Sequence, residues 1–300
     1  MTMADINLEG LGVALVTPFK EDFSIDFQAL EILIEHVING GCDYIVVLGT
    51  TAETPTLSEK EKKEISFFIK KQVNSRVPLV IGIGGNNTER VINDIKTRDL
   101  EGYSAILSVT PYYNKPTQEG LFQHFKAIGN VSPIPILLYN VPGRTGVNMT
   151  PTTSLRLAEF SDKFCGVKEA SGKIDQCKEI IKDAPSNFHV ISGDDALICP
   201  LMKIGAKGVI SVLANAFPCE VQKLVSLCQK SKFDEAEICQ KNLQPLISHL
   251  FEDGNPCGIK AVLSQLGMIK NILRLPLVPV SEYVERNLAK ESSVFLKETK

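Results

Sequence analysis

The 300-residue sequence lacks any apolar run that approaches the roughly 20 residues of a membrane-spanning helix. Its first residues, Met1-Thr-Met-Ala-Asp-Ile, form neither a basic n-region nor an apolar h-region, so we expect no secretory signal. A formal net charge of -3 offers no basic surface for nucleic acid. These absences predict a cytoplasmic protein that binds neither membrane nor nucleic acid.

Paired cysteines and clustered metal ligands are missing as well. No two cysteines have C-x-x-C spacing, and no cysteine–histidine group has zinc spacing. Scattered cysteines in a long chain are typical of free, mostly buried thiols in a cytosolic protein. We therefore expect neither a disulfide framework nor a metal. The cysteines are Cys42, Cys165, Cys177, Cys199, Cys219, Cys228, Cys239 and Cys257, and the histidines are His36, His124, His189 and His249.

What the sequence does contain is a regular alternation of short apolar runs and amphipathic segments. The apolar runs start near residues 12, 44, 78, 105, 134, 165, 188 and 208. Eight apolar strands that alternate with helices indicate an α/β fold with a buried parallel sheet, and eight such units favour a closed (β/α)8 TIM barrel. An open doubly wound sheet is the alternative, but no G-x-G-x-x-G follows the first strand.

After the eighth strand the pattern becomes entirely helical. Helices are expected near Phe233–Phe251, Gly258–Leu266 and Val280–Lys297. We therefore predict two domains, a catalytic barrel at 1–230 and a small C-terminal helical domain at 231–300.

Local capping signals predict where several helices begin. A helix is expected over Asp26–Ile38, and another after Ser58, with Glu61 completing a capping box. Thr150-Pro151 is typical of an N-cap followed by the first helical residue. A further helix is expected over Thr88–Gly102.

Lys168 ends the sixth apolar run, so a strand there would place it at the C-terminal mouth of the barrel. Burial favours the neutral form of a lysine amine, and a neutral amine can attack a ketone to form a Schiff base. Most lysines that follow a strand are solvated surface residues, so this segment alone leaves both interpretations open.

The other predicted strand ends are rich in hydroxyl groups. They lack a histidine, a cysteine nucleophile and a carboxylate cluster for Mg²⁺ or Zn²⁺. Asp194-Asp195 is the exception, and such a pair more often caps the following helix than holds a metal. This set suits imine chemistry better than metal or thiol chemistry. It comprises Thr17, Gly49-Thr-Thr51, Thr110-Pro-Tyr-Tyr113, Tyr139, Lys168, Gly193-Asp-Asp195 and Ile210-Ser211.

Three residues of this set, and one arginine in a nearby loop, each have two interpretations. Thr50 and Thr51 could bind a substrate carboxylate or be ordinary loop hydroxyls. Tyr139 could present its phenol as a proton shuttle at the barrel mouth, or be a core tyrosine. Arg144 could grip a second carboxylate in a bidentate contact, or be an ordinary loop arginine.

Motifs along nearly the whole chain carry a family resemblance. The sequence resembles the dihydrodipicolinate synthases, within the N-acetylneuraminate lyase family of class I aldolases. The resemblance runs from Val16-Thr-Pro-Phe19 to the region of Asn255-Pro256 and Lys260. Its most specific parts are Gly49-Thr-Thr-Ala-Glu53, Tyr139-Asn-Val-Pro-Gly-Arg-Thr-Gly146 and Gly166-Val-Lys-Glu-Ala170, with Ser192-Gly-Asp-Asp195 and Gly208-Val-Ile-Ser-Val212 in addition.

The resemblance implies roles for the catalytic residues. Lys168 would form the Schiff base with pyruvate, and Tyr139 would be the general acid/base in a relay with Thr50 and Tyr113. In this family the equivalent of Tyr113 crosses from the neighbouring subunit of a tight dimer. The resemblance therefore implies a homo-oligomer, a homotetramer built as a dimer of dimers.

Four further residues would bind substrate by the same resemblance. Thr51 would hold the pyruvate carboxylate, and Arg144 would bind the carboxylate of L-aspartate 4-semialdehyde. Gly193 and Ile210 would contribute backbone oxygens beside the lysine. The implied reaction condenses the two substrates on the diaminopimelate route to lysine, and it needs no cofactor because the imine is the electron sink.

Two alternatives remain. One is an aldolase of the same superfamily that cleaves a sialic acid or a keto-deoxy sugar acid. Sialic acid lyases resemble this chain at the lysine and tyrosine, but they generally lack an arginine equivalent to Arg144 and usually have Gly-Ser-Thr in the first loop. Both features here favour the synthase. A barrel that has lost catalysis and binds small metabolites is the other alternative, and the presence of Lys168, Tyr139 and Thr50 argues against it.

The chain departs from the family pattern in two places. Ala52 replaces a usual glycine, which is tolerated unless the loop needs a positive φ there. At the site where some members bind inhibitory lysine, Asn86 and Tyr112 match, but Glu59 and Lys62 replace frequent histidines, and Arg90 lies at or beside a usual glutamate. Strong feedback inhibition by lysine is therefore not expected.

Overall fold

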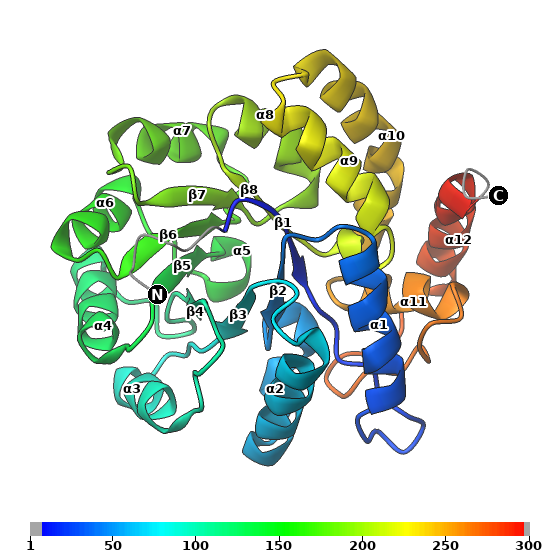
Figure 1. Cartoon of the computed structure of the whole chain (residues 1–300), viewed down its shortest axis with the longest axis horizontal. Coiled ribbons are helices and arrows are strands. Elements are labelled where there is room, and N and C mark those ends of the chain that lie inside the picture. Colours follow the sequence, from blue (N-terminus) through cyan, green and yellow to red (C-terminus); the bar gives the residue numbers. More distant parts are fainter. Residues whose placement is uncertain (1–7, 297–300) are drawn as a thin grey trace.

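The computed structural model describes residues 8–296. Eight parallel strands pair in sequence order and close into a barrel, with β1 hydrogen-bonded to β8. Helices surround the barrel (Figure 1), which confirms the predicted (β/α)8 architecture. The strands are β1 (Gly10–Ala14), β2 (Tyr44–Val47), β3 (Leu79–Gly82), β4 (Ala105–Val109), β5 (Ile136–Asn140), β6 (Phe164–Glu169), β7 (His189–Ser192) and β8 (Gly208–Ser211).

The helices follow the strands in alternation until β8 and then follow one another. Those before or directly after β8 are α1 (Phe27–Asn39), α2 (Glu59–Val73), α3 (Thr88–Thr97), α4 (Gln118–Val131), α5 (Pro142–Thr145), α6 (Pro151–Phe160), α7 (Ile174–Asp183), α8 (Ile198–Lys203) and α9 (Pro218–Gln229). The C-terminal helices are α10 (Phe233–Glu252), α11 (Cys257–Gln265) and α12 (Glu282–Leu296).

Two hydrophobic clusters hold the fold together. The larger lies between the strands and the helices and continues into the C-terminal helices through residues such as Leu243, Leu250 and Val262. The smaller fills the inside of the barrel and includes Tyr44, Leu107, Tyr139 and Ile210. The two faces of each strand are therefore both buried, as the continuous apolar runs predict.

Gly12 lets the interior cluster pack at this density. A Cβ atom on Gly12 would lie 2.3 Å from two carbon atoms of the Tyr44 ring, so only glycine leaves room for the ring across the β1–β2 pair. Tyr44 is consequently fully buried beneath the catalytic end of the barrel.

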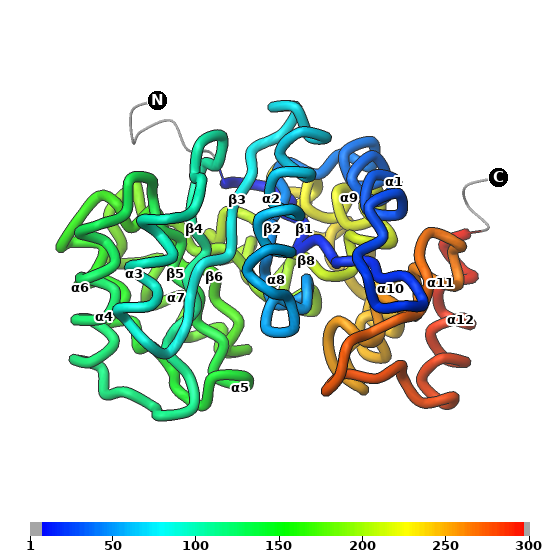
Figure 2. Tube along the Cα trace, turned by 90° about the horizontal axis from the view of Figure 1, so that it is seen from below, coloured from blue at the N-terminus to red at the C-terminus, as the bar shows by residue number. Residues whose placement is uncertain are grey.

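The C-terminal helices lie on the side of the barrel formed by α1 and α9, opposite α3, α4 and α6 (Figures 1 and 2). The predicted domain boundary at 230/231 falls in the short turn between α9 and α10. Because one continuous apolar cluster spans this boundary, the helices are packed against the barrel. The division into two domains stays a prediction.

Local capping predictions are confirmed. Ser58 and Thr150 cap α2 and α6 as predicted, and Ser58 and Glu61 form the capping box. Asp26, for which no cap was predicted, caps α1. Several boundaries differ from the sequence prediction. β1 begins earlier and ends at Ala14, since the N–H of Val16 bonds to the Asn215 side chain instead of a strand.

The other differences arise in loops. α3 ends at Thr97 and not at Gly102, because the Asp99 side chain accepts a hydrogen bond from the Glu101 N–H and turns the chain. The short helix α5 was not predicted, although Pro142 at its start and Gly146, with φ of 74°, at its end are its signals. In the described part of the chain, no helix is long and apolar enough to cross a membrane.

Candidate active site

Lys168 and Tyr139 lie side by side at the C-terminal ends of β6 and β5. The two residues are partners in the strand register, so both side chains point into the barrel. Lys168 is 6% exposed and Tyr139 is also 6% exposed. The Lys168 Nζ atom lies 4.4 Å from the centre of the Tyr139 ring. The structure thus places a buried amine against a phenol, as imine chemistry with a proton shuttle requires.

The space for Lys168 is created by Gly193, which follows β7. A Cβ atom at Gly193 would lie 3.0 Å from Lys168 Cε and 2.7 Å from Ala170 Cβ. Gly193 itself is hydrogen-bonded through its N–H to the Glu169 carbonyl at 2.8 Å. The missing side chain of Gly193 therefore determines where the lysine chain can run.

A buried polar network locks the strands that carry Lys168 and Tyr139. Asn140 follows Tyr139 and Glu169 follows Lys168, and these two residues are also partners in the strand register. The Asn140 Nδ2 atom donates to both Glu169 carboxylate oxygens at 3.1 Å. The same carboxylate accepts from Gln176 Nε2 at 2.8 Å and from the Ser171 N–H at 2.8 Å. This network fixes β5 against β6 one residue beyond the reactive pair.

Thr50 and Thr51 lie on a 3₁₀ turn, Thr50–Ala52, at the end of β2. Thr51 is 2% exposed, whereas Thr50 is half-buried and lines the cavity beside Tyr139. In this part of the chain the residues with a positive φ are Leu48, at 56°, and Glu53, at 54°. Ala52 is not among them. Alanine at position 52 therefore causes no backbone strain.

Asn255, just before α11, touches both of the residues expected to bind carboxylates. Its Nδ2 atom donates to Thr51 Oγ1 at 3.0 Å, and its carbonyl accepts from Arg144 Nη2 at 3.3 Å. Its own side-chain Oδ1 is buried without a protein partner. Arg144 itself is exposed on α5, where its guanidinium can reach a ligand. Sequence reasoning did not identify Asn255 as part of the site.

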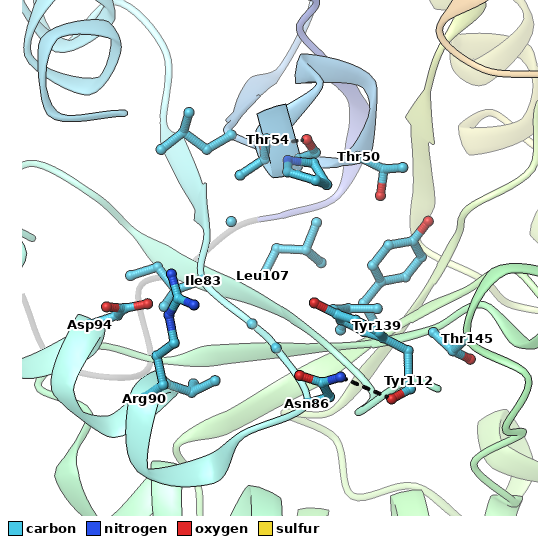
Figure 3. Close-up of a pocket in the computed structure, with 18 of the residues that line it drawn as sticks. Thr50, Thr54, Ile83, Asn86, Arg90, Asp94, Leu107, Tyr112, Tyr139 and Thr145 are labelled. Atoms are coloured by element: carbon cyan, nitrogen blue, oxygen red, sulfur yellow. Dashed lines mark hydrogen bonds between the residues drawn. The ribbon is translucent and has the colours of Figure 1, made fainter. Parts of the chain in front are cut away.

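A cavity of about 710 Å³ is lined by Thr50, Tyr139 and Arg144 among these residues. Figure 3 shows the Tyr139 ring pointing towards Thr50. Tyr112 lies below Tyr139 in this view, and its carbonyl accepts from Asn86 Nδ2 at 3.3 Å. Apolar side chains such as Leu107 form much of the floor of the cavity. A cavity of this size accommodates two small keto and aldehyde acids.

The outer end of the cavity is basic. It is lined by Lys62, Arg90 and Arg98 together with Asp94. Glu59 pairs with the three cations, at 2.8 Å for Lys62, 3.8 Å for Arg90 and 3.1 Å for Arg98. The cavity thus presents an excess of positive charge at its mouth.

The structure does not bring Tyr113 to Tyr139 within one chain. Tyr113 is 89% exposed and has φ of 74°, and it does not line the cavity. Ile210, in contrast, is 1% exposed and belongs to the interior cluster with Tyr139.

Asp194 and Asp195 are capping residues. Asp194 accepts from the Ala196 N–H at 2.9 Å. Asp195, which is 1% exposed, accepts from Ser211 Oγ and from the N–H groups of Val212 and Leu213, and it joins β7 to the end of β8. Over residues 8–296, no group of three histidine, cysteine or acidic residues could hold a metal ion.

The thiol nearest to the reactive lysine in sequence is not a nucleophile. Burial raises the pKa of Cys165 to about 12, and its Sγ atom lies 3.4 Å from the Ile136 carbonyl. Cys165 therefore stays protonated at neutral pH.

Comparisons with known proteins agree with this geometry. The model of the dihydrodipicolinate synthetase family matches residues 7–293. The chain is 56% identical over 277 residues to the 4-hydroxy-tetrahydrodipicolinate synthase of Parabacteroides distasonis, covering 92% of this chain and 93% of that protein.

Solved structures give the same result. Dihydrodipicolinate synthase from Thermotoga maritima superposes with a TM-score of 0.93 at 38% identity, covering 95% of this chain and 98% of the other. A monomeric dihydrodipicolinate synthase variant superposes with a TM-score of 0.91 at 40% identity, covering 95% of this chain and 97% of the other.

Proposed function

The chain belongs to the dihydrodipicolinate synthetase family, and we propose that it condenses pyruvate with L-aspartate 4-semialdehyde through an imine on Lys168. It is a lyase, and its reaction is that of the 4-hydroxy-tetrahydrodipicolinate synthases, on the diaminopimelate route to lysine. The observation that supports the imine is the buried Lys168 amine 4.4 Å from the Tyr139 ring at the mouth of the barrel.

The first half of the reaction is imine formation. The Lys168 amine attacks the keto carbon of pyruvate, and the carbinolamine loses water to give the imine. Thr51 holds the pyruvate carboxylate, while backbone oxygens of Gly193 and Ile210 lie beside the lysine. Tyr139 donates the proton that leaves with the carbinol oxygen, and Thr50 and Tyr113 return a proton to it.

The second half forms the carbon–carbon bond. Loss of a methyl proton converts the imine into an enamine, whose carbon attacks the aldehyde carbon of L-aspartate 4-semialdehyde. Arg144 binds the carboxylate of this second substrate through charge-assisted hydrogen bonds. The amino group of the second substrate then attacks the imine carbon, which closes the ring as the new carbon–nitrogen bond forms, and the bond to Lys168 breaks and frees its amine. The 89% exposure of Tyr113 supports its supply to a neighbouring subunit, and hence a dimer within a homotetramer.

Two further proposals concern the setting of the enzyme. The eight cysteines form no disulfide, and five of them are buried, which supports a cytoplasmic location. The basic mouth formed by Lys62, Arg90 and Arg98 repels the amines of free lysine, which supports weak feedback inhibition by that amino acid.

Reduction of the imine tests the proposed function. The protein is incubated with pyruvate and borohydride, and the intact mass and peptide map are measured. We expect one adduct on Lys168 per chain, none in Lys168→Ala, and a loss of on the order of 10³-fold in kcat for that variant. An adduct on another residue, or full activity of Lys168→Ala, contradicts the proposal.

A further inference from the structure

Glu53 combines an unfavourable backbone with a fully buried carboxylate. Its φ of 54° lies in the left-handed region, which L-residues rarely adopt. Leu48, on the other side of the Thr50–Ala52 turn, also has a positive φ, of 56°. Such conformations persist when the surrounding structure fixes them. The contacts of the Glu53 side chain show what fixes this one.

The Glu53 carboxylate is held entirely by the C-terminal part of the chain. One oxygen forms an ion pair with Lys260 Nζ at 2.5 Å, and both side chains are 0% exposed. The other oxygen accepts from the Arg274 N–H at 3.0 Å. Both carboxylate oxygens therefore have partners, and both partners come from residues beyond α10.

Lys260 is committed to this one position. Its Nζ atom also donates to the Ile272 carbonyl at 2.9 Å and lies 4.1 Å from the centre of the Phe19 ring. Burial lowers the pKa of Lys260 to about 8, although the Glu53 carboxylate acts to raise it. The charged pair is therefore costly to bury. Apolar side chains of equal volume stabilise such a site as well or better, so stability alone does not explain the pair.

The pair is directly connected to the carboxylate-binding turn. Glu53 comes two residues after Thr51, and its N–H bonds to the Thr50 carbonyl at 3.1 Å. Thr51 Oγ1 accepts from Asn255, which lies five residues before Lys260 in sequence. The turn is thus held at Thr51 by Asn255, just before α11, and at Glu53 by Lys260 within that helix.

We propose that Glu53 and Lys260 are positioning residues that hold the Thr50–Thr51 turn in the geometry that binds the carboxylate of pyruvate. This inference rests on the proposed function, because it assigns Thr51 to pyruvate. Neither residue touches the substrate. The C-terminal helices act on the first substrate through this pair, and the second substrate, bound by Arg144, depends on it less.

Loss of the pair moves the turn and weakens pyruvate binding before it affects the chemical step. A displacement of about 1 Å at a positioning group lowers catalytic efficiency by up to about 10²-fold. We expect Glu53→Asp, which keeps the charge but shortens the reach by one methylene, to raise KM for pyruvate about tenfold. KM for the aldehyde and kcat at saturating pyruvate should change less than about threefold.

Three variants and a control separate positioning from folding. Lys260→Met leaves Glu53 unpaired, and Glu53→Gln/Lys260→Met removes both charges. The control is Lys203→Met, which breaks the exposed 2.9 Å pair of Lys203 with Glu237 between α8 and α10. Initial rates are measured against each substrate, borohydride trapping is measured against pyruvate concentration, and thermal melts report folding.

We expect the double variant to melt at or above the temperature of Lys260→Met and still to show the raised KM for pyruvate. The control should keep wild-type constants. A double variant or Glu53→Asp that folds and has wild-type KM for pyruvate overturns the inference, as does an equal rise of KM for both substrates. If the wild-type chain traps no pyruvate at all, the proposed function fails, whatever these variants do.

Discussion

At the scale of single residues, the site depends on what is absent as much as on what reacts. Gly193 leaves the channel for the Lys168 side chain, and Gly12 leaves room for Tyr44 below it. The family resemblance assigns Gly193 a backbone oxygen near the lysine. The structure adds a steric role that applies whichever atoms bind substrate.

Gly193→Ala should obstruct the reactive lysine. The new Cβ would lie 3.0 Å from Lys168 Cε, so the side chain must move by several tenths of an ångström. We expect kcat to fall about 10²-fold, since misplacement of a reacting group is costly, with a matching fall in the rate of borohydride trapping.

Gly143→Ala is the matched control, because nothing lies within 4 Å of a Cβ built there. It should retain nearly full activity. Equal trapping rates in Gly193→Ala and the wild type would show that the lysine does not depend on this space.

Much of the site can be predicted from the sequence because strand ends of a barrel converge. Lys168 and Tyr139 each end an apolar run, and parallel register then brings them together. The space at Gly193 could not be predicted, since it depends on the path of the Lys168 side chain past the neighbouring strand. Asn255 was missed because its contact with Thr51 joins segments far apart in sequence.

At the scale of elements, the side chains that cap helices could be predicted from the sequence, whereas contacts between distant segments could not. Asp26, Ser58 and Thr150 cap their helices through contacts within three residues, so their side-chain types are sufficient evidence. The end of α3 depends on a loop contact instead, and the local signals of α5, Pro142 and Gly146, are short enough to be taken for a turn. One available signal was overlooked: Lys260 stands alone in the apolar run Cys257–Leu263, which indicates a buried and paired charge.

The buried lysine of α11 predicts a pH dependence of stability. Burial lowers the pKa of Lys260 from 10.5 to about 8, Arg274 lowers it further, and Glu53 and Cys257 oppose the shift. Between about pH 8 and 10.5 the native state has released a proton that the unfolded state still binds. The free energy of unfolding therefore gains up to about 1.4 kcal/mol per pH unit in this window.

The measurement compares denaturant midpoints of the wild type and of Glu53→Gln/Lys260→Met across that range. The stability of the wild type relative to the double variant should rise with pH, because only the wild type has this lysine. A difference that stays constant or falls would mean that Lys260 keeps its proton throughout.

At the scale of the whole molecule, the exposed Tyr113 predicts shared active sites. Tyr113→Phe and Lys168→Ala should each be nearly inactive, with Tyr113→Phe losing about 10²-fold in kcat. In a hybrid dimer, one site combines the intact lysine of one chain with the intact tyrosine of the other. Random mixing after subunit exchange should therefore restore activity in about a quarter of the sites.

Mixing without subunit exchange is the control and should restore nothing. If the exchanged mixture also stays inactive, while mass spectrometry shows that hybrids have formed, Tyr113 serves its own chain or no site at all. An active monomer observed by light scattering would lead to the same conclusion.

The grip of Asn255, Lys260 and Arg274 on the Thr50–Glu53 turn also sets a sequence of events on the ribosome. All eight barrel strands have been synthesised by residue 211, but these three residues follow only after α10. The Thr50–Glu53 turn can therefore gain these contacts only after α11 and the segment up to Arg274 have been synthesised, which at about 5–20 residues per second is several seconds after the last barrel strand.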